Sequence, residues 1–259
     1  MTPEQLKEAM GALPEPPSDS RPPFWDYWRH DLWTRAQTEE DPRNFEKWPC
    51  IYHTMLVNHW HDYIQKQYAK IRDMPRLVSE THLPPYPSDR LDNTPHSMNL
   101  IHQAHHLWTF FKTVGLQMHK QKRIVEFGGG YGAMALLARR LCLAGSYHII
   151  DLPEFALLQQ FYLSQMGADG HVTWGDPPDR CDLLIANHSL SEIPIDKRDR
   201  WIIALRPRAV LFLYSSRFAG YDNVAYFQEH LPDKFDAYRF EHVSCDDVLP
   251  TGSWYTIGR

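Results

Sequence analysis

The sequence predicts an α/β fold with a mostly parallel sheet, one antiparallel edge strand and a helical segment in front of it. From Arg123 onward, short apolar runs alternate with helical stretches, as in parallel sheets covered by helices. The run Asp182–Ala186 is apolar throughout its interior, which is typical of a strand buried on both faces. The last two runs, Tyr238–Val243 and Trp254–Ile257, have no helix between them and therefore predict antiparallel pairing.

The segment before the sheet reads as helices joined by proline-rich connections. Proline restricts its own backbone and that of the residue before it, so Pro14–Pro23 and Leu83–Pro95 are expected to be extended or looped. Apolar spacing predicts helices over Phe24–Gln37, Ile51–Ile71 and Asn99–Leu116. We place the division of the chain between a helical cap, residues 1–98, and an α/β domain, residues 99–259.

Within the α/β domain the expected elements follow one another in a regular order. Strands are predicted over Ile124–Phe127, Tyr147–Ile150, His171–Trp174, Asp182–Ala186 and Ala209–Tyr214. Helices are predicted over Ala133–Leu143, Glu154–Met166, Asp196–Leu205 and Asp222–Leu231. Gly167 stands directly after the second of these helices, where a glycine commonly ends a helix.

Composition excludes several classes of protein. The chain has 259 residues, 43% apolar and 23% charged, which is ordinary for a globular protein. Its net charge of −5 argues against a nucleic-acid partner. No apolar run reaches the roughly 18 to 20 residues that a membrane span needs. Met1–Pro14 carries charges and lacks an apolar core, so we expect no signal peptide and a cytoplasmic location.

Cysteines and histidines give no convincing metal site. The four cysteines are far apart and form no CxxC pair, so we expect reduced thiols: Cys50, Cys142, Cys181 and Cys245. His59 and His61 would face different sides of a helix and would not converge on one ion. No oxygen-rich ligand set is apparent either, so no metal is predicted.

A glycine-rich loop separates the first strand of the domain from its first helix. Gly128 and Gly130 allow a tight turn and the close approach of a ligand, and the loop ends at Gly132. The helix that follows has free backbone N–H groups at its N-terminus, and these favour anionic groups. Gly128, Gly130 and Ala133 also satisfy the dinucleotide pattern GxGxxG/A, so the loop alone does not choose a cofactor.

Glu126, at the end of the first strand, favours a positively charged ligand. A pyrophosphate in this confined site would face its carboxylate, which is unfavourable. S-adenosylmethionine carries an ammonium and a sulfonium and no phosphate, so a nearby carboxylate would stabilise it. The alternative is that Glu126 only caps the helix or pairs with a surface arginine.

Two further acids follow the next strands. Asp151 ends the second strand, where an acid can accept hydrogen bonds from both ribose hydroxyls. Asp151 is also a candidate helix N-cap. Asp176 follows the third strand and is a candidate partner for the exocyclic amine of adenine, with Trp174 flanking the ring; a simple turn residue is the alternative.

Three segments of this region resemble a known family, the bacterial sugar O-methyltransferases. They are EFGGGYGAMALLARRL, YHIIDLPEFALLQQFYL and DLLIANHSLSEIP, within Arg123–Pro194. The resemblance implies a Rossmann-like class I methyltransferase fold, S-adenosylmethionine as methyl donor, and a sugar hydroxyl as acceptor, often in polysaccharide or glycoside biosynthesis. It matches Glu126, Gly128, Gly130 and Gly132 to the donor loop, and Asp151 to the ribose-binding acid.

The general base has to be argued from chemistry. A sugar hydroxyl is a poor nucleophile at neutral pH, so a positioned base is expected beyond the strand ends. His188, after the fourth strand, is the first candidate, because an imidazole pKa of about 6.5 suits proton abstraction near neutrality. Glu192 is the second, as base or as the group that orients His188, and Asn187 is a candidate contact to the donor or acceptor. His102 and His106, one helical turn apart, compete for the same role.

The leading hypothesis is therefore an S-adenosylmethionine-dependent O-methyltransferase acting on a sugar or glycosylated small molecule. Aromatic side chains near the start of the chain are candidates to line the acceptor pocket, although core packing is the simpler role: Trp25, Tyr27, Trp28 and Trp33. The alternatives are a methyltransferase for a non-sugar hydroxyl, an NAD(P)-dependent oxidoreductase and a non-catalytic cofactor-binding subunit. The sequence leaves the oligomeric state open, a homo-oligomer included.

Overall fold

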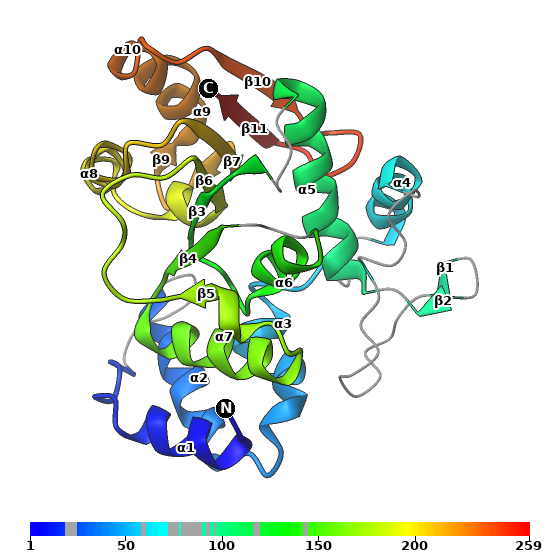
Figure 1. The fold of residues 1–259 in the computed structure, drawn as a ribbon, viewed down its shortest axis with the longest axis vertical. Coiled ribbons are helices and arrows are strands. Elements are labelled where there is room, and N and C mark those ends of the chain that lie inside the picture. Colours follow the sequence, from blue (N-terminus) through cyan, green and yellow to red (C-terminus); the bar gives the residue numbers. More distant parts are fainter. Residues whose placement is uncertain are drawn as a thin grey trace.

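A seven-stranded sheet organises the protein, in the order β10-β11-β7-β6-β3-β4-β5 (Figure 1). The computed structural model describes residues 1–18, 25–57, 61–71, 78, 90–91, 94–95, 97–115, 120–141 and 145–259. The strands are β3 (Arg123–Phe127), β4 (Ser146–Ile150), β5 (Val172–Thr173), β6 (Leu183–Asn187), β7 (Ala209–Ser215), β10 (Phe240–Ser244) and β11 (Ser253–Gly258).

Pairing within the sheet is parallel from β5 to β7 and antiparallel beyond it. β11 runs antiparallel to β7 on one side and to the edge strand β10 on the other. The predicted mostly parallel sheet with antiparallel pairing at one edge is thus confirmed. β4 and β5 lie on one side of β3, and β6 and β7 on the other. The strand order therefore reverses between β3 and β6, which is where open α/β sheets bind ligands.

Alternation along the central strands explains why the sheet is covered on both faces. Leu183 and Ile185 of β6 belong to one core cluster, and Leu184 and Ala186 belong to the other. Successive side chains of a strand point to opposite faces, so a wholly apolar strand needs an apolar layer on each side.

Helices supply those two layers. The first cluster includes apolar side chains of α5 (Met98–Val114), α6 (Ala133–Arg140) and α7 (Pro153–Gln165). The second includes side chains of α8 (Ile195–Leu205), of the π-helical segment Tyr226–His230 and of α10 (Leu231–Lys234). A short helix α9 (Asn223–Ala225) precedes the π-helical segment, so the helix predicted over Asp222–Leu231 is present in an irregular form.

The N-terminal helices pack against the sheet-covering helices. α1 (Pro3–Gly11) and α2 (Trp25–Thr38) lie beside α7, and α4 (His61–Ile71) lies beside α5 (Figure 1). Leu6 and Leu32 are fully buried in the same cluster as Leu158 of α7. The boundary between residues 98 and 99 stays a prediction.

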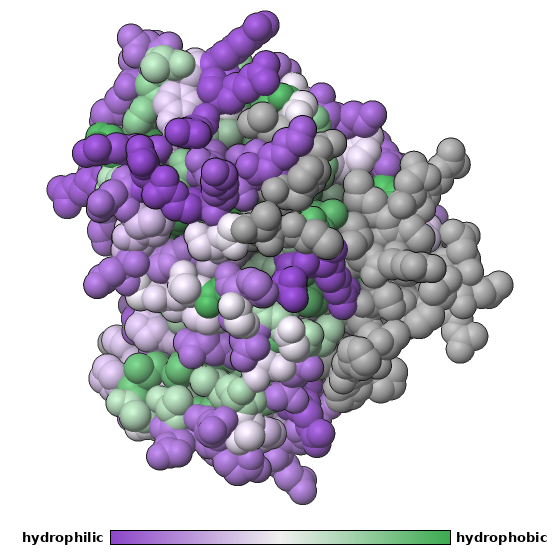
Figure 2. Space-filling view, viewed as in Figure 1, coloured by the Kyte–Doolittle hydropathy of each residue, from purple (hydrophilic) through white to green (hydrophobic). Residues whose placement is uncertain are grey.

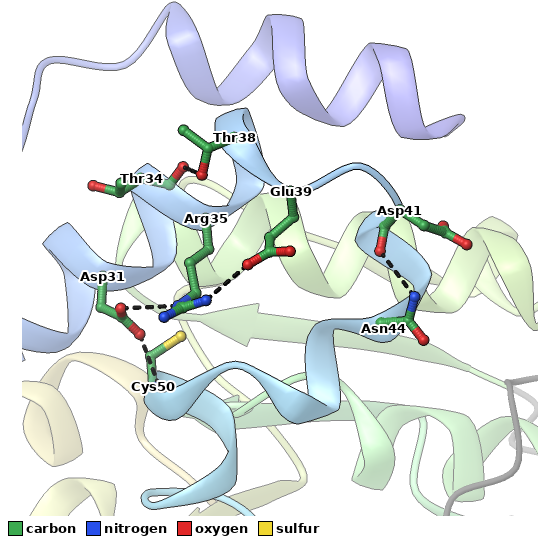
Figure 3. Close-up of polar contacts among 8 residues, drawn as sticks. All are labelled: Asp31, Thr34, Arg35, Thr38, Glu39, Asp41, Asn44 and Cys50. Carbon is green, nitrogen blue, oxygen red and sulfur yellow. Dashed lines mark hydrogen bonds and ion pairs between the residues drawn. The ribbon is translucent and has the colours of Figure 1, made fainter.

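Side chains of α2 fix the following helical turns. Asp31 accepts a hydrogen bond from the backbone N–H of Cys50, in α3 (Pro49–Tyr52), at 3.0 Å, and another from Arg35 at 3.1 Å (Figure 3). Arg35 also pairs with Glu39 at 2.7 Å. Between α2 and α3, Asp41 caps the 3-10 helix Pro42–Lys47. This network fixes α3 against α2. The residues directly after α3 lie near the carboxyl ends of the central strands.

One predicted helix is interrupted. The apolar spacing predicted a single helix over Ile51–Ile71, but α3 ends at Tyr52 and α4 begins at His61. The hydroxyl of Thr54 hydrogen-bonds to the carbonyl of Cys50, and residues 53–57 turn away to line a cavity. Apolar spacing detects which residues are buried, but not a break that exposes backbone to a ligand site.

Some predicted elements lie largely outside the described residues. Of the loop predicted over Leu83–Pro95, only β1 (Arg90–Leu91) and β2 (Thr94–Pro95) are described, and they pair with each other antiparallel. A second short hairpin joins β8 (Arg217–Phe218) to β9 (Tyr221–Asp222). Hydrophilic residues predominate over the coloured part of the face in Figure 2. None of the helices described here is both long and apolar enough to span a membrane.

Candidate functional site

A cavity of about 570 Å³ opens at the carboxyl ends of β3, β4 and β6. The glycine loop after β3, helix α5, Trp25 and residues 53–57 all line it. This volume is within the range of small-molecule sites, and the position is the strand-order reversal described above.

The glycines of the loop serve different purposes. Gly128 and Gly130 have φ values of 72° and 59°, which favour glycine. A Cβ on Gly128 would lie 2.3 Å from the Cβ of Ser189, so the loop after β6 presses against it. A Cβ on Gly130 would meet only Met55, at 3.5 Å or beyond. Gly132 caps α6, packs against Tyr162 and does not line the cavity. Gly130 is thus the glycine whose backbone a ligand can approach closely.

Glu126 lines the cavity as an almost fully buried carboxyl. Tyr147 donates a hydrogen bond to it at 2.9 Å. Burial raises the pKa of Glu126 to about 8, the Tyr147 hydrogen bond opposes the rise, and the charge of Asp151 adds to it. Without a cation nearby, the side chain is therefore largely protonated at neutral pH. It is a carboxyl that a positively charged ligand would ionise, rather than the fixed negative charge that the sequence argument assumed.

Asp151 also lines the cavity, but the chain already uses most of its oxygen lone pairs. One oxygen accepts hydrogen bonds from Gly129 N at 2.9 Å and Gln159 Nε2 at 2.6 Å, and the other accepts one from Leu152 N at 2.8 Å. Burial raises its pKa to about 6, against the effect of these donors. A carboxylate offers about four acceptor positions, so one remains for a ligand.

Gln159 is a site residue that sequence reasoning missed. It is fully buried, donates to Asp151 and to the carbonyl of Gly130, and accepts from the indole N–H of Trp174 at 2.9 Å. Trp174 therefore supports the glycine loop through Gln159 and does not line the cavity. Asp176 is exposed and also lies outside the lining. The one signal in the sequence is that Gln159 stands four residues after Phe155 and four before Leu163, on a buried face of α7.

The turn after β6 brings Asn187, His188 and Glu192 to the cavity, as predicted. Asn187 donates to Gln103 of α5 at 2.9 Å, and its own amide oxygen is buried with no partner in the described part of the chain. His188 has φ 65° and ψ −37°, a strained conformation for a residue with a side chain, and its N–H donates to Leu213 O at 2.7 Å. This turn leads into the 3-10 helix Ser189–Glu192.

His188 and Glu192 differ in their proton affinity. Burial lowers the pKa of His188 to about 4, so its imidazole is neutral at pH 7. Burial raises the pKa of Glu192, while the hydrogen bond that it accepts from the Trp25 indole at 3.0 Å opposes the rise. A carboxylate with a raised pKa accepts a proton more readily than an imidazole with a lowered one.

α5 places two more histidines in the cavity wall. The rings of His102 and His106 are 4.2 Å apart, and burial lowers the pKa of each well below its usual value, an effect that the nearby His188 reinforces. His102 contacts Gln67 at 3.2 Å, and His106 contacts the Tyr255 hydroxyl at 2.6 Å. The structure therefore brings His102, His106 and His188 into one neutral cluster.

Of the four N-terminal aromatic residues, only Trp25 lines the cavity. Its ring packs edge-on against Phe155, with 5.6 Å between ring centroids. Tyr27, Trp28 and Trp33 do not line it, and Trp28 and Trp33 pack against the core.

Arg198 supports the site from outside the cavity, and no sequence pattern indicated it. Its guanidinium is fully buried and donates to the carbonyls of Ser191 and Ile193 at 2.7 and 2.8 Å, on either side of Glu192. A third hydrogen bond, at 2.8 Å, goes to Asn223. Three charge-assisted hydrogen bonds of this kind fix the turn that carries Glu192.

In the described part of the chain, no group of three or more His, Cys, Asp or Glu side chains is arranged to hold an ion. His59 and the side chain of His61 lie outside the described residues, as does Cys142; Cys50, Cys181 and Cys245 are buried free thiols.

No protein-family model matches the sequence, and no curated protein matches it either. Several solved structures are similar in fold. A ribosomal protein L11 methylase from Lactobacillus delbrueckii subsp. bulgaricus is 14% identical over 61% of this chain and 77% of that one, with a TM-score of 0.40. A precorrin-6y C5,15-methyltransferase from Geobacter metallireducens GS-15 is 19% identical over 58% and 84%, with a TM-score of 0.39. An O-methyltransferase family protein from Burkholderia thailandensis is 13% identical over 76% and 70%, with a TM-score of 0.41. At these values the similarities do not bear on substrate or activity.

Proposed function

We propose that this protein is an S-adenosylmethionine-dependent O-methyltransferase that acts on a hydroxyl group of a sugar or glycosylated small molecule. One observation carries the proposal. The cavity at the strand-order reversal is lined by three carboxyls, those of Glu126, Asp151 and Glu192. The described residues that line it include no lysine or arginine. Such a lining stabilises a positively charged ligand and opposes a pyrophosphate.

The residues around the glycine loop fit this donor. Asp151 retains one acceptor position for a ribose hydroxyl, and Gly130 leaves its backbone open to close approach. Glu126 lies beside them and gains a stabilising partner when a cation binds. When bound, S-adenosylmethionine supplies an electrophilic methyl group on a sulfonium.

The turn after β6 and helix α5 carry the groups that would prepare the acceptor. We propose Glu192 and His188 as the candidates for the proton acceptor, with His102 as a third, because all three line the cavity. The side chain that takes the hydroxyl proton makes the oxygen a better nucleophile, and its fixed position aligns that oxygen with the methyl group. Trp25 and residues 53–57 line the cavity from the predicted cap, residues 1–98.

Cofactor identity can be tested without knowing the acceptor. We expect S-adenosylhomocysteine to raise the melting temperature of the protein and NADH to leave it unchanged, because the acidic lining opposes a pyrophosphate. Asp151→Asn should reduce the shift. The exposed Asp176→Asn is the matched control and should not. A shift with NADH alone would favour the oxidoreductase alternative and contradict the proposal.

A second test separates an enzyme from a binding subunit. Once an acceptor is found, Glu192→Gln and His188→Ala should each be compared with the wild type for methyl transfer and for S-adenosylhomocysteine affinity. Loss of a general base reduces turnover by about 10²- to 10⁴-fold. We expect this loss in at least one variant, with the affinity retained. Unchanged turnover in both variants and in His102→Ala would contradict the base assignment.

A further inference from the structure

One part of the cavity wall has its own chemistry. It is formed by α5, with Asn99, His102, Gln103 and His106, and by the end of β6, with Asn187. Its histidines at 102 and 106 are neutral at pH 7, because burial holds the pKa of each imidazole well below the usual value. The described part of this wall therefore offers no positive charge.

Three buried polar atoms in this wall have no hydrogen-bond partner among the described residues: Asn99 Oδ1, His106 Nε2 and Asn187 Oδ1. In each residue the other end of the side chain is anchored. Asn99 donates to the Tyr131 hydroxyl at 2.8 Å, Asn187 donates to Gln103 at 2.9 Å, and His106 contacts Tyr255. Leaving a buried polar atom without a hydrogen bond costs free energy. A bound ligand that forms hydrogen bonds with these three atoms would recover that cost.

Two of the three atoms are amide oxygens held in place by their own NH₂ groups. Such oxygens only accept hydrogen bonds, so their partner has to be a donor such as a hydroxyl. A phosphate or carboxylate at neutral pH brings further acceptors and negative charge. A phosphate or carboxylate group placed here would lose its hydration and would lie in the same cavity as Glu192. It would gain no cation from the described lining, so its binding would be strongly unfavourable.

We propose that the acceptor is an uncharged molecule with several hydroxyl groups, bound through Asn99 and Asn187, and that acceptors carrying phosphate or carboxylate are rejected. The inference rests on the proposed function, because it assigns the remaining wall of the same cavity to the acceptor. It narrows the substrate class by charge rather than by the identity of the sugar.

A matched pair of probes tests this selectivity. Protein with ¹⁵N-labelled asparagine is saturated with S-adenosylhomocysteine and titrated with D-glucose or with D-glucose 6-phosphate at equal ionic strength. The side-chain amide signals of Asn99 and Asn187, assigned with Asn99→Leu and Asn187→Ala, report binding at the wall. We expect glucose to shift both signals. Glucose 6-phosphate should need an at least tenfold higher concentration to produce the same shifts.

The outcomes separate the inference from the function on which it rests. If S-adenosylhomocysteine does not raise the melting temperature, the proposed function fails, and this inference with it. If it does, and glucose 6-phosphate shifts the signals at equal or lower concentration than glucose, only the inference fails. Glucose that moves neither signal up to about 200 mM overturns it as well, because that concentration is far above a millimolar dissociation constant.

An engineered cation provides a second, independent measurement. Gln103→Lys places a positive charge in the wall and should lower the concentration of glucose 6-phosphate needed for binding by at least tenfold. Gln65→Lys on the exposed side of α4 is the matched control and should change nothing. An equal gain in both variants, or no gain in the first, counts against a wall whose selectivity depends on charge.

Discussion

The indole N–H of Trp25 donates a hydrogen bond to the carboxyl of Glu192 at 3.0 Å, although 167 positions separate the two residues. The N-terminal part of the chain thereby contacts a candidate proton acceptor directly. Trp25 also packs against Phe155 of α7, so its indole is held in position from two sides.

Replacing this indole should change the proton affinity of Glu192. The Trp25 hydrogen bond lowers the pKa of Glu192 against the effect of burial, so Trp25→Phe is expected to move that pKa upward. The pKa can be followed by NMR of ¹³C-labelled glutamate carboxyls, with Glu192→Gln to assign the signal. Trp28→Phe, which leaves the cavity lining intact, is the control. A downward shift in Trp25→Phe would show that the hydrogen bond does not stabilise the carboxylate.

Glu126 should make the stability of the ligand-free protein depend on pH. Its pKa of about 8 in the folded state lies above the ordinary value near 4.5, so the folded state binds more protons than the unfolded state between these values. The stabilisation is complete below pH 4.5 and is lost as the pH rises through 8. We expect the free energy of unfolding to fall by about 2–3 kcal/mol more in the wild type than in Glu126→Gln between pH 6 and pH 9.

Urea denaturation at each pH measures this difference, with the exposed Glu8→Gln as control. Saturation with S-adenosylmethionine should move the fall to lower pH, because a cation stabilises the ionised carboxyl. If Glu126→Gln followed the same pH curve as the wild type, Glu126 would not be the group responsible.

The ion pair between Arg29 and Glu154 should be important for stability. Two hydrogen bonds of 3.0 Å join them, and the Glu154 side chain is only 1% exposed. Arg29→Met leaves a buried carboxylate unpaired, which we expect to cost about 2–4 kcal/mol because Arg29 itself is partly exposed. The double variant Arg29→Met/Glu154→Leu should recover most of this loss. Urea denaturation of the wild type, Arg29→Met, Glu154→Leu and the double variant gives the coupling free energy, and additive losses would contradict this coupling.

Arg198 is expected to act as a positioning residue. A lysine keeps the charge but cannot reach Ser191, Ile193 and Asn223 together, so Arg198→Lys should lose about 2–4 kcal/mol of stability. Methyl transfer should fall further than S-adenosylhomocysteine affinity, because the turn carrying Glu192 loosens while the glycine loop does not. Arg200→Lys, on the exposed side of the same helix, is the control. Equal losses of turnover in both variants would exclude a positioning role.

Much of the fold could be predicted because its signals are local. Apolar runs placed β3, β4, β6 and β7 within one residue at each end, since a strand buried on both faces is apolar at most positions. The glycine loop and the acids at the strand ends were equally visible, because parallel strands bring their carboxyl ends to one edge.

The contacts that complete the site are long-range and could not be predicted in this way. Trp25 contacts Glu192, and Arg198 contacts the carbonyls around Glu192, only after the chain has folded. Neither Trp25 nor Arg198 has a distinctive sequence context. Burial also changed the chemistry expected of predicted residues. Glu126 is a carboxyl of raised pKa and His188 an imidazole of lowered pKa, which residue type alone does not reveal.

The backbone of His188 has a consequence for how this protein can change over generations. At φ 65° a side chain strains the turn, so His188→Gly should be more stable than His188→Ala, the reverse of the order in an ordinary helix or strand. A population screened for heat survival alone would accumulate the glycine and lose the imidazole. If His188 has the proposed role in methyl transfer, stability and turnover select for different residues at this position.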